Sequence, residues 1–165
     1  MMRISPAVDG RVDMSADGVQ IWGMPLDSHA WVWGIRAAGF FHFVTLALAS
    51  VTPIPPNWDE NLAQLPEIHR RFAMAQNVFI GAVIAAAGLI SLCFAPLLIE
   101  GTTLARVICA CIALWWGGRL VVLPWLGAHR FLPTTALRIG YALLLSECAL
   151  YTIGYGYLAL NRFER

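Results

Sequence analysis

The sequence lacks lysine and has few charged residues of any kind. Charged residues make up 13% and hydrophobic residues 59% of its 165 residues, whereas an ordinary soluble domain has about 25% charged residues. A soluble chain of this length needs more polar side chains to cover its surface, so the composition excludes an ordinary soluble domain. The formal net charge of +1 gives no electrostatic attraction for nucleic acid, which we therefore exclude as a partner.

The sequence also lacks the short motifs that mark common catalytic and metal sites. It has no phosphate-binding glycine loop, no HExxH pair, no serine nucleophile elbow and no zinc-ligand spacing. The cysteines lie in apolar segments without CxxC spacing, which favours a packing role for Cys93, Cys109, Cys111 and Cys148. These absences favour a protein without enzymatic activity and predict neither a metal nor a cofactor, although they leave an intramembrane enzyme open.

Four long apolar runs dominate the rest of the sequence, and each is about the 20 residues that cross a bilayer as a helix. They cover residues 31–52, 72–95, 103–126 and 136–160 and are bounded by proline, glycine or charge. We therefore predict an all-α integral membrane protein whose residues 30–165 form a four-helix transmembrane bundle. Residues 1–29 form a short polar N-terminal tail. The expected surroundings are the lipid bilayer of a bacterial cytoplasmic membrane.

Three smaller features carry structural predictions. Asn57 is predicted to cap a short surface helix that continues to about residue 65. The small residues Gly81, Ala85 and Gly88 form a stripe that we expect to face another helix, because small side chains let helix backbones approach closely in lipid. Residues 1–20 contain too little apolar surface to offset the entropy of ordering them, and we expect them to be poorly ordered.

Ionisable side chains within the spans are the candidate functional residues, because placing them in a bilayer is costly. His42, Arg119 and Glu147 lie deep in the first, third and fourth spans. If the third and fourth spans form a hairpin, Arg119 lies about one turn from Glu147 in height, so we expect an ion pair. Tyr151 and Tyr155 share a helix face with Glu147, together with Leu143 and Leu144. The predicted binding cluster is therefore His42, Arg119, Glu147, Tyr151 and Tyr155, and the alternative is a salt bridge that only holds the helices together.

His42 also has a separate interpretation as a ligand of a tetrapyrrole. Ala38 lies one helical turn before it, and a small residue at this position leaves room for a flat macrocycle bound at the imidazole. Over these five residues the spacing resembles that of bacterial light-harvesting polypeptides. The alternative is a hydrogen-bonded histidine in the helical core.

The sequence leads to three functional hypotheses. The first is a non-enzymatic accessory subunit, or a small carrier of an apolar or weakly acidic molecule, that uses the intramembrane cluster. It implies a membrane protein partner or self-association. The second is an intramembrane enzyme or oxidoreductase subunit that acts on a lipid-soluble substrate such as a quinone. The third is a tetrapyrrole-binding subunit with His42 as the ligand.

Overall fold

The computed structural model describes residues 28–51 and 57–161, and these residues form helices and connecting turns without a strand. The elements are α1 (Ser28–Val51), α2 (Trp58–Ala63), α3 (Glu67–Ile99), α4 (Thr103–Trp125), the 3-10 helix η1 (Ala128–Phe131) and α5 (Thr135–Leu160). Four of them, α1, α3, α4 and α5, are long and apolar enough to cross a membrane. The all-helical prediction is confirmed, whereas the predicted disorder of residues 1–20 lies outside the described residues.

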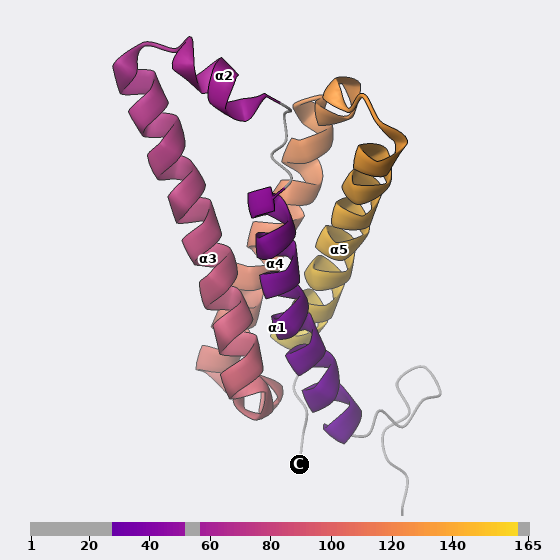
Figure 1. Ribbon diagram of the computed structural model, residues 1–165. Helices are drawn as coiled ribbons and strands as arrows, with labels where there is room; N and C mark the ends of the chain where they lie inside the picture. The colour runs from indigo at the N-terminus through magenta and orange to yellow at the C-terminus, as the bar shows by residue number, and fades with distance from the viewer. Residues whose placement is uncertain (1–27, 52–56, 162–165) are drawn as a thin grey trace, which may run out of the picture.

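The four long helices form two closely packed pairs, α1 with α3 and α4 with α5. Figure 1 shows α3 close to the other long helices near its turn to α4 and farther from α4 and α5 toward α2. The start of α1 and the end of α5 lie at the same end of the bundle, whereas α2 and η1 lie at the other end (Figure 1). Sequential long helices therefore run in alternating directions.

Glycines bring α1 and α3 into close contact. A Cβ atom on Gly88 would lie 3.0 Å from the Cβ of His42 and 3.1 Å from the carbonyl oxygen of Gly39, so neither backbone has room for a side chain. Earlier in α3, a Cβ atom on Gly81 would lie 3.5 Å from Leu46, which is ordinary packing, and Ala85 is half-buried. The prediction that the small-residue stripe faces another helix is therefore confirmed most strongly at Gly88.

Two local predictions differ from the structure. Pro96 was expected to end the second span, but α3 continues to Ile99. Proline removes a backbone donor and clashes with the preceding turn, and the helix accommodates it through a non-helical residue, Phe94, with φ −116° and ψ 18°.

The short helix α2 forms after Asn57, as predicted, but Asn57 has a left-handed φ of 61° and its side chain makes no capping hydrogen bond. Its backbone carbonyl accepts from the N–H of Asn61 at 3.0 Å.

Large apolar side chains cover the outer faces of the long helices. Phe79 on α3, Leu114 on α4 and Ile153 on α5 are 72%, 76% and 69% exposed. Contiguous apolar surface of this extent is unusual for a soluble monomer and is the expected partner of lipid. Together with the lengths of the four helices, it suggests an integral membrane protein.

Candidate functional site

His42 lies at the point where α1 meets α4 and α5, and its side chain is fully buried. Its Nδ1 is 2.7 Å from the carbonyl oxygen of Ala38, one turn earlier in α1. Its Nε2 is 3.1 Å from the indole Nε1 of Trp116 on α4. An indole N–H can only donate, so Nε2 must be the acceptor and the ring proton must sit on Nδ1. The contacts therefore fix His42 as the neutral Nδ1–H tautomer.

Aromatic rings surround the His42 imidazole on two further sides. The ring of Tyr151 stacks on it with centroids 4.2 Å apart, and the ring of Trp116 meets it edge-on at 5.2 Å. Both imidazole nitrogens are engaged and the ring faces no open space, so the geometry does not favour a tetrapyrrole at His42. The arrangement is that of the alternative interpretation, a hydrogen-bonded core histidine.

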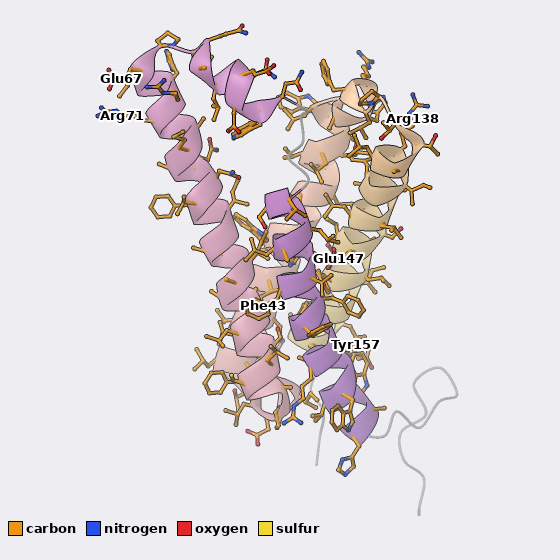
Figure 2. The ribbon with its side chains drawn as sticks, in the orientation of Figure 1. Phe43, Glu67, Arg71, Arg138, Glu147 and Tyr157 are labelled. Carbon is orange, nitrogen blue, oxygen red and sulfur yellow. The ribbon has the colours of Figure 1, made fainter. Side chains whose placement is uncertain are left out.

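Glu147 points from α5 toward α1 at mid-height in the bundle (Figure 2). The hydroxyl of Thr45 on α1 lies 2.7 Å from Oε1 and 2.6 Å from Oε2 of the carboxyl group. The hydroxyl of Tyr151, one turn later on α5, lies 2.6 Å from Oε1. The same Tyr151 hydroxyl is 3.1 Å from the carbonyl oxygen of Ala38. Glu147 is therefore half-buried among oxygen partners from two helices.

The predicted ion pair between Arg119 and Glu147 is not formed. No hydrogen bond or ion pair joins them, and the guanidinium carbon of Arg119 lies 5.7 Å from the ring centroid of Trp116 on its own helix. The physical reason is competition. The hydroxyls of Thr45 and Tyr151 reach the carboxylate, while the Trp116 ring lies one turn from Arg119 and attracts the cation. Thr45 was not among the predicted site residues, although its hydroxyl lies three residues after His42 in the same apolar run.

Tyr155 is also buried, but its hydroxyl takes part in a second polar contact away from Glu147. It lies 2.6 Å from the hydroxyl of Ser91 on α3, which donates to the carbonyl oxygen of Ala87 at 2.7 Å. The single hydroxyl proton of Ser91 is donated to Ala87, so in the contact between the two hydroxyls Tyr155 is the donor and Ser91 the acceptor. Ser91 was not singled out from the sequence, although it is the one hydroxyl in the inward face of the second apolar run.

Leu143 was expected to share the inward face of α5 with Glu147, but its side chain is 65% exposed, so that part of the prediction is wrong.

Three hydrogen-bond donors on α4 and α5 have no acceptor among the residues that the structure describes. They are Nε1 of Trp115, Nε of Arg119 and the hydroxyl of Tyr141, and each of these atoms is buried. Trp115 and Arg119 are four residues apart and so lie on the same face of α4. A buried donor without an acceptor is costly, particularly on a helix surrounded by lipid. This face of α4 is therefore suited to a group that accepts hydrogen bonds.

The structure thus brings four of the five predicted site residues into one polar and aromatic core, with Arg119 beside it. His42, Glu147 and Tyr151 are linked directly or through Ala38, and Tyr155 packs against the ring of Tyr151 at 6.2 Å. Within residues 28–51 and 57–161, no group of three metal-ligating side chains comes together. Comparisons of the chain with protein-family models, curated proteins and solved structures give no match.

Proposed function

We propose that this protein is a non-enzymatic integral membrane protein that binds or carries a weakly acidic amphipathic molecule, whose acidic group is held by Arg119. The observation that carries the proposal is the state of this guanidinium. It lies inside a helix long enough to cross a membrane, its Nε is buried, and no described residue accepts a hydrogen bond from that nitrogen.

The charge of Arg119 requires a partner. Arginine keeps its proton under all ordinary conditions, so it cannot escape the cost of burial by becoming neutral. The nearby carboxylate of Glu147 accepts hydrogen bonds from Thr45 and Tyr151 and none from Arg119. An acceptor supplied from outside the chain is therefore favoured, and a carboxylate fits the planar fork of guanidinium donors best.

The surroundings of Arg119 favour an amphipathic acid over a small soluble anion. Arg119 lies six residues before the end of α4 at Trp125, which is about 9 Å along a helix that rises about 1.5 Å per residue. Trp116 borders its guanidinium, and Val121 and Val122 in the next turn are exposed apolar residues. An acid with an apolar tail could reach this depth from the bilayer while its tail stays in lipid.

The alternative of a quinone-linked oxidoreductase gains less support from the geometry. The aromatic rings of the site on which a quinone would stack are those of His42, Trp116 and Tyr151. They are 0%, 0% and 6% exposed and pack on one another. A quinone ring would have to displace one of them in order to stack.

The proposal is tested by mass spectrometry of small molecules that copurify with the protein in mild detergent. Wild type is compared with Arg119→Gln and with the matched control Arg138→Gln, which removes an exposed arginine near the start of α5. We expect an acidic amphipathic molecule in wild type and the control and at least a tenfold loss in Arg119→Gln. Equal retention in all three proteins would contradict the proposal. Retention of bulk phospholipid alone would assign Arg119 to a lipid phosphate and would contradict a carrier role.

A further inference from the structure

Four oxygen-bearing groups from two helices form a cluster that we name the carboxyl cluster. Its members are Thr45 and the carbonyl of Ala38 on α1, and Glu147 and Tyr151 on α5. Four oxygen–oxygen contacts connect them, at 2.7 and 2.6 Å from Thr45 to the carboxyl group, 2.6 Å from Tyr151 to the carboxyl group, and 3.1 Å from Tyr151 to Ala38. Each pair of groups in contact needs a proton between them to be favourable. The two contacts of Thr45 share its single hydroxyl proton, so the cluster needs three protons in all.

An ionised Glu147 leaves the carboxyl cluster one proton short. The two hydroxyls then supply the protons, and a carboxylate accepts both of them. The Tyr151 proton points to Glu147, since a hydrogen bond to a charged oxygen is the stronger one. The 3.1 Å contact between Tyr151 and the carbonyl oxygen of Ala38 then brings two oxygens together without a proton between them.

A protonated Glu147 gives a chain in which every group donates once. Thr45 donates to one carboxyl oxygen at 2.6 Å, and the carboxyl O–H donates a hydrogen bond to the Tyr151 hydroxyl oxygen across their 2.6 Å contact. The Tyr151 proton is then free to turn to the carbonyl oxygen of Ala38 at 3.1 Å. Ala38 can accept this bond beside the one from Nδ1 of His42, because a carbonyl oxygen has two lone pairs.

We infer that Glu147 is an intramembrane proton-binding carboxyl group, and that the Tyr151 hydroxyl switches from Glu147 to the carbonyl oxygen of Ala38 when the proton binds. The step forms one O–H bond on Glu147 and breaks one O–H bond of a hydronium ion, which is left as water; no bond within the protein breaks. The ring of Tyr151 stays stacked on His42 in both states, because only the torsion of its hydroxyl changes. This site goes beyond the proposed function and does not depend on what Arg119 binds.

The charged and titratable groups around the carboxyl cluster come from every helix packed against it. On α1, His42 is the neutral tautomer fixed by Trp116. On α4, Arg119 lies beside the cluster, and its guanidinium carbon is 5.7 Å from the ring centroid of Trp116. On α5, Cys148 is adjacent to Glu147 and is buried. Between Arg71 and Glu100, α3 carries one titratable side chain, Cys93, which is exposed. Apart from Glu147 itself, Arg119 is therefore the charged group of this set.

Infrared spectroscopy of the full-length protein in lipid vesicles tests the inference, because a protonated carboxyl group has a C=O stretch that a carboxylate lacks. We expect a carboxylic acid band that grows as the pH falls, shifts in heavy water and is missing in Glu147→Gln. In Tyr151→Phe the ionised form loses the stronger hydrogen bond, so the band should change frequency and its midpoint should rise by about one pH unit. The matched control Tyr155→Phe removes a hydroxyl from the same helix outside the cluster and should leave band and midpoint unchanged.

Two results would overturn the inference. One is a wild-type spectrum with no acid band that differs from Glu147→Gln at any pH at which the protein stays folded. The other is a Tyr151→Phe protein whose band and midpoint match those of Tyr155→Phe, which would remove the hydroxyl switch. If Glu147→Gln does not fold, the difference between the two tyrosine variants still assigns the band. None of these results depends on a ligand, so they are separate from the outcome for Arg119.

Discussion

His42 is held in place by a donor from another helix, and this contact gives a prediction at the scale of one residue. Trp116→Phe keeps an aromatic ring but removes the N–H that points at Nε2 of His42. The buried nitrogen then has no donor, so we expect the free energy of unfolding in detergent to fall by about 1 kcal/mol. Nitrogen NMR of labelled histidine should show Nε2 unprotonated in wild type and its resonance shifted in the variant. A protonated Nε2 in wild type would show that the indole contact is absent.

The depth of the site residues could be predicted from the sequence, but their partners could not. His42 and Glu147 lie near the middle of long apolar runs, and position in a run gives depth directly. The partners depend on how α1 is rotated and shifted against α4 and α5, and no short-range pattern encodes this. Arg119 was paired with Glu147 because only the hairpin between α4 and α5 could be laid out, which left out Thr45 on α1.

At the scale of the helices, the contact between α1 and α3 predicts different effects for two glycines of the same helix. In Gly39→Ala the new Cβ would lie 2.9 Å from both the carbonyl oxygen of Gly88 and the backbone of Leu92, so the helices must separate. We expect a loss of about 1–3 kcal/mol in the free energy of unfolding. In Gly34→Ala the Cβ meets nothing within 4 Å, and the better helix propensity of alanine should leave the protein as stable or slightly more so. Equal effects in denaturant titrations would mean that α1 and α3 do not pack at Gly39.

The number and type of the long helices follow from the sequence because twenty or so apolar residues leave few alternatives to a spanning helix. The predicted runs match α1, α3, α4 and α5 within a few residues, except that α3 is longer at both ends. Its extension beyond Pro96 could not be foreseen, because a proline can either end a helix or kink it. The outcome depends on whether neighbouring packing holds the chain, and Ala95, Leu98 and Ile99 on both sides of the proline are buried.

In the whole molecule, the two helix pairs are joined by polar side chains. Within the pair of α1 and α3, glycines bring the backbones together. Between the pairs, Thr45 contacts Glu147 and Trp116 donates to His42. Tyr155 contacts Ser91 in the same way. Because lipid gives no hydrophobic drive for two apolar helices to associate, such hydrogen bonds can set which pair faces which. The polar core of the candidate site therefore also forms the contact between the pairs.

The arrangement of four long helices also predicts the topology of the chain. Since α1 starts and α5 ends at the same end of the bundle, a membrane that all four helices cross must leave the start of α1 and the end of α5 on one side (Figure 1). Reporter fusions after residues 29 and 163 should give the same location, and an insertion within η1 should give the opposite one. Opposite locations for the two terminal fusions would mean that one helix does not cross. If that helix were α1, Thr45 would no longer lie beside Glu147, and the carboxyl cluster would be lost with the topology.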